Sequence, residues 1–497
     1  MSIIKEASRC ALKKFVLAGC FTLVPFIAAA QQAAPQATPP PPAAPRSVPV
    51  PKPVERTLPN GLRVVVVERS NVPLISSALV IKNGGEVDPP QLAGLADLTA
   101  SLLTKGTATR TAPQIAEAIE ALGGSIESGA RWDASTASVG VMSAHTGAAL
   151  EILADVVRRP TFKDEEIERL RQQYLDDLTV ALGQPGAIAR YVASRVVFGD
   201  APYGHPLSGT PESIAQIKRA DIVRMHTTYY RPDNAILVIG GDIKADEAFR
   251  TVERFFGDWQ KPAAPLPTST TKAAAASVNK GQRVVVIDKP DAGQAAVLVA
   301  RTGIRRTDPE FFRGIVANSV LSGYSGRLNQ EIRIKRGLSY GARSALETRR
   351  EVGPFMAEAQ TKNESGAVVA GLLLGEVGRL ANGELPDAEL TPRKAVLIGG
   401  FARNLETASG LVSQVASLAL QGLSFDEINN YINNVQSITA KDVQGFAGSR
   451  LDVKATNIII VGDAKKFLPE LQKQYPNVEV IPVGDLNLNR AELRKTK

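Results

Sequence analysis

Cysteine and histidine are scarce in this chain of 497 residues. Both cysteines, Cys10 and Cys20, lie close to the N-terminus, so the rest of the chain can form no disulfide and no thiolate metal site, and it has no cysteine nucleophile. The three histidines, His145, His205 and His226, are too far apart in sequence for any two to share one helix turn. A metal site built from two histidines of one helix is therefore excluded.

Long apolar runs and clusters of basic residues are missing as well. After the N-terminal segment, no stretch approaches the roughly 18 apolar residues that a membrane-spanning helix needs, so we expect no membrane span in the mature chain. The formal net charge of +8 is spread out, without Lys/Arg runs interleaved with aromatics, which argues against a nucleic-acid partner. Hydrophobic residues at 44% and charged residues at 22% are typical of a globular protein.

The N-terminal segment has the pattern of an export signal. Lys13 and Lys14 precede an apolar stretch that ends in the small residues 28–30, which predicts a signal peptide over 1–30 and a periplasmic location. As an alternative, Leu17 to Cys20 could be a lipoprotein box, with the chain lipid-anchored through Cys20. A Pro/Ala-rich tether is expected to follow over 31–54.

The body of the chain contains an internal duplication. The segment GLRVVVVE at 61–68 is echoed by GQRVVVID at 281–288, and NAILVIGGD, ending at Asp242, is echoed by NIIIVGD, ending at Asp463. These matches occur in the same order at a nearly constant offset. We therefore expect two homologous domains, followed by a short polar tail, with the boundaries 55–260, 281–485 and 486–497 and a linker over 261–280.

Each half mixes strands and helices in the sequence pattern. β-Branched runs predict buried strands, whereas apolar residues at helical spacing predict helices between them. One such helix is expected to begin at Asp88 and to present Leu95 and Leu98 on one face. The fold class we predict is α+β, with each of the two homologous domains formed by a mostly antiparallel sheet with packed helices. Further helices are expected over 111–122, 146–158, 164–182 and 245–259.

The segment GLADLTASLLTKGT at 94–107 resembles the motif GxAHxxEHxxxxGT of the insulinase/pitrilysin zinc metallopeptidases, which include mitochondrial processing peptidase. The resemblance extends over the duplicated halves and includes FKDEEIERLRQQYLDD at 162–177, YGHPLSGT at 203–210 and YYRPDNAILVIGGD at 229–242. It implies the two-domain fold of that family and a relation to peptide hydrolysis.

The metal-binding motif of that family is degenerate in this chain. H-x-x-E-H places two zinc ligands and a catalytic base on one helix, and here the three positions are Asp97, Ala100 and Ser101. The position of the downstream acidic ligand matches Asp177. Since this set has at most two carboxylates and no imidazole, we expect no tightly bound zinc in this chain.

The second half retains another signature of the family. Residues 321–341, LSGYSGRLNQEIRIKRGLSYG, are similar to a glycine-rich loop and helix followed by R-x-x-x-x-x-x-Y, which Arg333 and Tyr340 match. A helix is expected over 327–336, with Gly337 at its C-terminal cap and Tyr340 at the start of the next strand. The resemblance implies that Arg333 and Tyr340 bind substrate and support the transition state.

These observations favour a non-catalytic, substrate-binding subunit of a heterodimeric zinc metallopeptidase that cleaves extended peptides. The expected partner is a homologous subunit with an intact H-x-x-E-H motif, which would hold the zinc and be completed by Arg333 and Tyr340. Two alternatives remain open. One is a catalytically inert structural or binding protein on the same fold, similar to core subunits of respiratory complexes, and the other is an atypical hydrolase that uses Asp97 and Asp177 with another metal.

Overall fold

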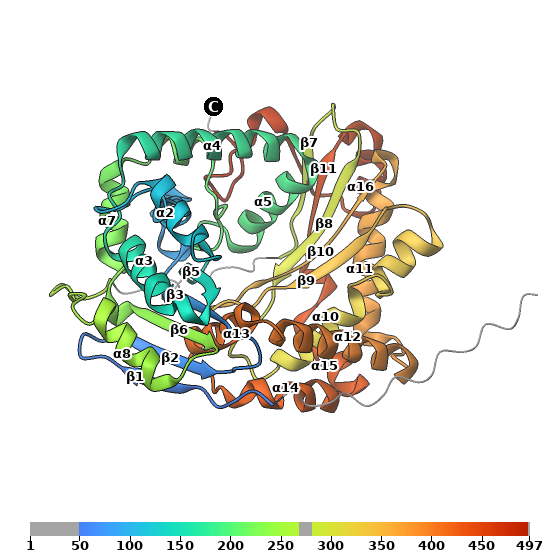
Figure 1. Ribbon diagram of the computed structural model, residues 1–497. Coiled ribbons are helices and arrows are strands. Elements are labelled where there is room, and N and C mark those ends of the chain that lie inside the picture. Colours follow the sequence, from blue (N-terminus) through green and yellow to red (C-terminus); the bar gives the residue numbers. More distant parts are fainter. Residues whose placement is uncertain (1–48, 268–280, 496–497) are drawn as a thin grey trace, which may run out of the picture. The chain divides into compact units, whose positions relative to one another are not determined.

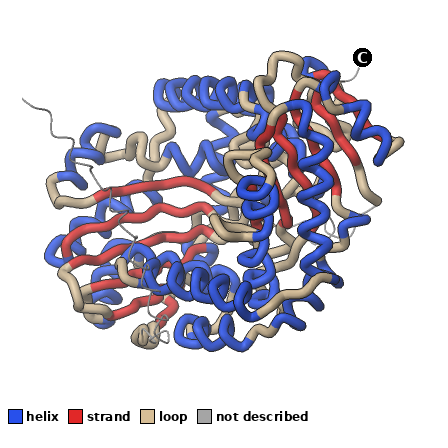
Figure 2. The backbone as a smooth tube through the Cα atoms, turned by 90° about the vertical axis from the view of Figure 1, so that its right-hand side faces the viewer, coloured by secondary structure: helices blue, strands red, loops and turns tan. Residues whose placement is uncertain are grey.

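The computed structural model describes residues 49–267 and 281–495. The predicted signal peptide with Cys20, most of the tether and most of the linker lie outside these described residues. Each half of the chain contributes one six-stranded sheet, which confirms the duplicated α+β architecture (Figure 1). Figure 2 shows the strands as two separate groups, each flanked by helices.

The two sheets have the orders β1-β2-β6-β3-β5-β4 and β12-β7-β11-β8-β10-β9, which are equivalent in five strands and differ at the edge strands β1 and β12. The echoed sequence motifs fall on equivalent strands, because β2 and β6 in the first sheet take the places of β7 and β11 in the second. Most strand pairs are antiparallel; among the described strands, β2–β6, β7–β11 and β7–β12 are parallel. The strands are Val54–Thr57 (β1), Arg63–Glu68 (β2), Leu74–Ile81 (β3), Ser125–Ala130 (β4), Ser135–Met142 (β5), Ala235–Gly241 (β6), Val284–Asp288 (β7), Ala295–Thr302 (β8), Ala342–Leu346 (β9), Pro354–Thr361 (β10), Asn457–Gly462 (β11) and Val478–Pro482 (β12).

The helices predicted from apolar spacing are present, with small shifts at their ends. The first half holds Leu95–Leu102 (α1), Ala112–Glu120 (α2), Thr146–Arg158 (α3), Asp164–Gly183 (α4), Pro185–Phe198 (α5), Pro211–Gln216 (α6), Arg219–Tyr229 (α7) and Ala245–Phe256 (α8). The second half holds Phe311–Leu321 (α10), Gly366–Asn382 (α11), Asp387–Leu405 (α12), Ala408–Gln421 (α13), Asp426–Ser437 (α14), Ala440–Arg450 (α15) and Leu468–Gln474 (α16).

The expectation that a helix begins at Asp88 is wrong, because α1 begins only at Leu95. Gly94, directly before it, has a φ of 91°, which interrupts the helical path. The Asp88 carboxylate accepts the backbone N–H groups of Gly94 and Ala96, both at 2.8 Å, and so caps α1 from outside the helix. Burial raises the pKa of this carboxyl well above its usual value, although both backbone hydrogen bonds oppose the shift.

The central strands are apolar on both faces, because each sheet is buried between two layers. In β2, Val64 and Val66 pack into a core formed with helices of the same half, whereas Val65 and Val67 face a second core. This is why these strands are near-continuous Val/Ile runs without alternation.

Each half supplies a helix to one face of the other half's sheet. In the first half, α5 packs on β8 and β11 of the second sheet and brings Ile188 and Val192 into their core. In the second half, α13 packs on β3 and β6 of the first sheet and brings Leu411 and Val415 into their core. The expected boundary between 55–260 and 281–485 therefore separates the two sheets, but one of the two cores against each sheet contains residues from both halves.

The structure describes the end of the predicted tether and most of the predicted polar tail, and both are packed against the rest of the chain. At the end of the predicted tether, Val50 is buried, and it exchanges two hydrogen bonds with the Asn429 side chain, at 2.9 and 3.0 Å. The predicted polar tail over 486–497 buries Leu488 and Leu493, and the Arg195 Nε donates to the Leu488 carbonyl at 2.7 Å. The two leucines explain this packing, and the description of the tail as polar did not take them into account.

Candidate functional site

The three positions of the degenerate metal motif lie on α1, and they face different surroundings. Ala100 is fully buried in the core of the first half, so this position offers no group that could act as a base. Asp97 and Ser101 lie one helix turn apart and both point toward α4. The Asp97 Oδ1 accepts the backbone N–H of Ala130 at the end of β4, at 3.3 Å.

Tyr174 on α4 joins Asp97 to Ser101. Its hydroxyl lies 3.1 Å from the Asp97 Oδ2 and 2.9 Å from the Ser101 Oγ. Since the carboxylate can only accept, the tyrosine donates to Asp97 and receives the proton of Ser101. Burial raises the pKa of Asp97 and of Tyr174, and the negative charge of Asp97 raises that of Tyr174 further. The phenol thus occupies the hydrogen-bonding positions that the two motif side chains would otherwise turn toward a ligand.

The sequence analysis did not identify Tyr174. It lies three residues before Asp177 on α4, so the two residues are separated by less than one helix turn. Its spacing of three residues from Asp177, the expected acidic-ligand position, would have indicated that Tyr174 lies near the same face of the helix. Asp177 itself is exposed and makes no hydrogen bond with the Asp97–Tyr174–Ser101 cluster.

Histidines do not replace the missing ligands. The His205 ring lies between the carbonyls of Pro206 and Gly85, at 2.9 and 3.0 Å, and burial lowers its pKa to about 4. His226 bonds to the Val157 carbonyl at 2.8 Å, and burial lowers its pKa to about 4 as well. Throughout residues 49–267 and 281–495, no group of three or more His, Cys, Asp or Glu side chains is placed to hold a metal ion.

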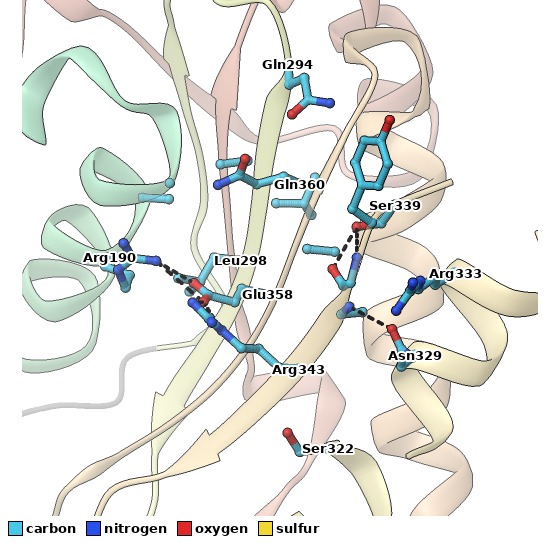
Figure 3. Close-up of a pocket in the computed structure, with 18 of the residues that line it drawn as sticks. Arg190, Gln294, Leu298, Ser322, Asn329, Arg333, Ser339, Arg343, Glu358 and Gln360 are labelled. Carbon is cyan, nitrogen blue, oxygen red and sulfur yellow. Dashed lines mark hydrogen bonds and ion pairs between the residues drawn. The ribbon is translucent and has the colours of Figure 1, made fainter. Parts of the chain in front are cut away.

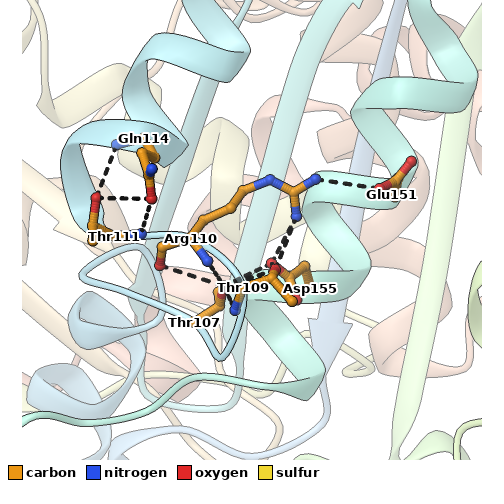
Figure 4. Close-up of polar contacts among 7 residues, drawn as sticks. All are labelled: Thr107, Thr109, Arg110, Thr111, Gln114, Glu151 and Asp155. Carbon is orange, nitrogen blue, oxygen red and sulfur yellow. Dashed lines mark hydrogen bonds and ion pairs between the residues drawn. The ribbon is translucent and has the colours of Figure 1, made fainter.

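The loop at 106–110, which follows α1, is held by hydrogen bonds to α3. Gly106 has a φ of 129°, a conformation that favours glycine, and Thr107 donates its hydroxyl to the Asp155 Oδ2 on α3 at 2.7 Å. Thr109 and Arg110 donate to the same oxygen, each at 2.8 Å (Figure 4). Burial opposes ionisation of Asp155, yet these three donors lower its pKa overall. The network fixes the loop that follows α1.

Arg333 and Tyr340 line one cavity of about 560 Å³ in the second half. Its walls come from α5, from β8, β9 and β10, and from the loop and helix at 322–343 (Figure 3). The Arg333 guanidinium forms no hydrogen bond or ion pair with any described residue, and it lies over the Tyr324 ring, whose centroid is 5.3 Å away. The Tyr340 side chain is 90% exposed, and its hydroxyl bonds to no described group. Both residues are therefore available as hydrogen-bond donors.

The helix that carries Arg333 is wider than an α-helix over most of its length. Asn329–Lys335 form a π-helix (η5), a geometry found frequently at functional sites. Gly337 ends it with a φ of 64°, as expected for a C-terminal cap.

Tyr340 does not begin the next strand, contrary to the sequence expectation. The Ser339 hydroxyl donates to the Gly341 carbonyl at 2.7 Å and accepts the Gly341 N–H at 3.1 Å, so a turn delays β9 to Ala342. The turn releases the Tyr340 side chain from the sheet, and this explains its exposure.

Comparison with protein families identifies the fold. A family model described as insulinase (peptidase family M16) matches residues 63–210, and one described as the peptidase M16 inactive domain matches residues 216–397. Among solved structures, an M16 inactive domain from Pseudomonas fluorescens shares 25% sequence identity and a TM-score of 0.75, covering 82% of this chain and 98% of that one. A protease from Helicobacter pylori shares the fold, with 20% identity and a TM-score of 0.77, over 83% of this chain and all of that chain.

Curated relatives agree with this comparison. An uncharacterized zinc protease of Mycobacterium leprae is 28% identical over 422 residues, which cover 83% of this chain and 93% of that protein. A probable mitochondrial-processing peptidase subunit beta of Arabidopsis thaliana is 25% identical over 269 residues, covering 54% of this chain and 50% of that protein. Within the described part of this chain, no helix is both long enough and apolar enough to cross a membrane. The chain belongs to the insulinase (M16) family, and the match includes the segment in which we expect that family's metal motif.

Proposed function

We propose that this chain is the non-catalytic, substrate-binding subunit of a heterodimeric zinc metallopeptidase that cleaves extended peptides. A homologous partner subunit with an intact H-x-x-E-H motif holds the zinc, and this chain holds none of its own. Arg333 and Tyr340 complete the partner's active site. The observation that carries the proposal is a contrast within one chain: Asp97 and Ser101 are bonded to Tyr174, whereas Arg333 and Tyr340 have unused donors on an open cavity.

The chemistry of amide hydrolysis explains why such a subunit is useful. Negative charge develops on the carbonyl oxygen of the scissile bond, and fixed donors aimed at that oxygen stabilise the transition state. An arginine remains charged over the whole working pH range and can also hold the peptide backbone. The zinc supplies Lewis acidity to the same step when it is bound in the partner.

The edge of the second sheet supports the binding of an extended peptide. β9 pairs with β10 on one side, and no described strand pairs with its other side. A peptide added as a further strand would run past the turn that carries Tyr340, because β9 begins two residues after it. The predicted signal peptide at 1–30 is the basis for proposing that this takes place in the periplasm.

The test is reconstitution with a homologous chain that has an intact H-x-x-E-H motif. The isolated chain is expected to contain no stoichiometric zinc and to cleave no peptide, whereas the mixture cleaves. Arg333→Ala and Tyr340→Phe, each in the mixture, are expected to reduce kcat/KM by about a hundredfold or more, as the loss of an oxyanion donor does.

A matched control is Arg336→Ala. Arg336 lies on the same segment, pairs with Glu331 at 2.8 Å and does not line the cavity, so full activity is expected. If the Arg333 and Tyr340 variants keep the full rate in an active mixture, the donor role is wrong. A stable complex with a homologous zinc-bearing chain that cleaves nothing would favour the inert structural protein instead.

A further inference from the structure

The cavity that contains Arg333 has an excess of positive charge. Its charged lining residues are three arginines, Arg190 on α5, Arg333 on η5 and Arg343 on β9, and one acid, Glu358 on β10. The remaining lining residues are uncharged. At neutral pH the four groups therefore leave two positive charges without a counterion in the lining.

Glu358, the one carboxylate of the lining, interacts with two of the arginines. Arg343, the cross-strand neighbour of Glu358, donates its Nε to the Glu358 Oε1 at 2.6 Å. Arg190 reaches the same carboxylate only at 3.3 to 3.4 Å, beyond the usual range for such a bond. Figure 3 shows Arg190 and Arg343 converging on Glu358, with Arg333 on the other side of the cavity.

Arg333 and Arg190 thus have donors to spare. Arg333 has an aromatic ring and no carboxylate as its neighbour, and Arg190 is 47% exposed on the opposite wall. The lining also includes small or apolar side chains, among them Ala189, Ala296, Leu298, Ala342 and Ala359. A ligand group that enters is partly removed from water, which strengthens its attraction to the arginines.

Gly186 and Gln360 also line the cavity. The amide of Gln360 bonds to no described group, so it is available to a ligand beside the arginines. The volume of about 560 Å³ is within the range of cavities that bind small ligands or short peptide segments.

We infer that this cavity selects peptides that carry a carboxylate near the bound segment, either an acidic side chain or a free C-terminus. Arg333 and Arg190 donate to that carboxylate, while Glu358 keeps Arg343 oriented and repels a second acid. The inference rests on the proposed function, because it names the substrate class of the same site. The preference for an acidic peptide comes from the charge inventory and not from the Arg333–Tyr340 signature.

The experiment measures peptide binding to the intact chain by fluorescence anisotropy, without the partner. Labelled peptides differ in one central residue, Glu, Gln or Lys, and each is made with a free acid and with an amidated C-terminus. The peptide with Glu, the free-acid peptide or both are expected to bind at least about tenfold more tightly than the amidated Gln peptide, since bonds to charged groups are the strong ones. The two series distinguish a side-chain carboxylate from a terminal one.

Variants assign the preference to the cavity. Arg190→Gln and Arg333→Gln are expected to abolish most of the discrimination between Glu and Gln, whereas Arg336→Gln leaves it unchanged. Glu358→Gln is expected to increase the affinity for the Glu peptide, because the competing carboxylate is gone. Thermal unfolding of each variant confirms that it is folded, and a merely structural role for Glu358 would lower the affinity for every peptide equally.

The outcomes separate this inference from the proposed function. If Glu and Gln peptides bind equally and both require Arg333, the carboxylate preference is wrong and the substrate-binding role survives. If inorganic phosphate displaces the amidated Gln and Glu peptides alike at the same low concentration, the site is a general anion site and the inference is overturned. If no peptide binds and no homologous partner is activated, both are wrong.

Discussion

At the scale of single residues, Tyr174 explains what has happened to the degenerate metal site. The sequence showed that Asp97 and Ser101 are poor zinc ligands, but it could not show that a phenol from another helix satisfies both of them. That contact joins residues more than seventy positions apart, and it depends on how α4 lies on α1. Arg333 and Tyr340 could be predicted as a pair, because their spacing lies within one helix–turn segment.

Glu86 is the buried carboxylate whose protonation we expect to show most clearly in stability. It is bonded to the Asn83 amide at 2.9 Å and to the Gly84 N–H at 2.7 Å, and it faces Arg350 from the other half at 3.3 Å. Burial raises its pKa to about 7, although Arg350 opposes the shift. The folded state therefore holds this proton more tightly than the unfolded state does.

Stability should consequently fall as the pH rises through the folded pKa of Glu86. His205 and His226 act in the opposite direction, since their lowered pKa values cost stability only as the pH falls from about 6.5 toward 4. Between pH 6.5 and 8, we expect the Glu86 contribution to decline by about 1 kcal/mol. The check is urea denaturation at both values: Glu86→Gln should remove this part of the decline, and an identical decline in both proteins would contradict it.

At the scale of elements, the sequence predicted most helix spans well and missed the start of one helix, α1. The spans of α3 and α4 follow from apolar spacing, because their buried faces are continuous. The start of α1 was missed because its cap, Asp88, precedes the helix by seven residues and reaches it across a 3-10 turn at Pro90–Leu92. Local capping rules look only at the residue next to the helix.

Asp88→Ala is expected to destabilise the protein by about 1 to 3 kcal/mol, because two backbone N–H groups at the start of α1 lose their buried acceptor. Asp88→Asn keeps one acceptor oxygen and should cost less. The control is Asp164→Ala at the start of α4, where the side chain is exposed and bonds to no described residue, so a change within about 0.5 kcal/mol is expected. Chemical denaturation measures all three, and equal losses for Asp88→Ala and Asp164→Ala would refute the capping role.

At the scale of the whole molecule, the duplication was visible in the sequence and the exchange of helices was not. The echoed strands identified two equivalent sheets, since each echo lies within one half. Which helix covers the second face of each sheet is decided by contacts between distant segments, such as α13 with β3 and β6, and the sequence pattern of neither half shows which helix of the other half it packs against.

The exchange predicts that the halves do not fold alone. Fragments 49–267 and 281–495 would each leave one sheet face without its covering helix, so each is expected to aggregate or to unfold without a cooperative transition. Produced together, they should associate into a complex with native-like thermal unfolding. Light scattering and calorimetry decide the matter, and two monodisperse fragments that unfold cooperatively on their own would refute the prediction.

The reciprocal cover also bears on how this polypeptide can change over time. Deleting the first half would remove α5, and with it Arg190, from the cavity of the second half. The first half is therefore needed for the structure of the second half, whether or not it contributes to catalysis. Side chains at the motif positions on α1 can be substituted one by one, while the structure around Arg333 is retained.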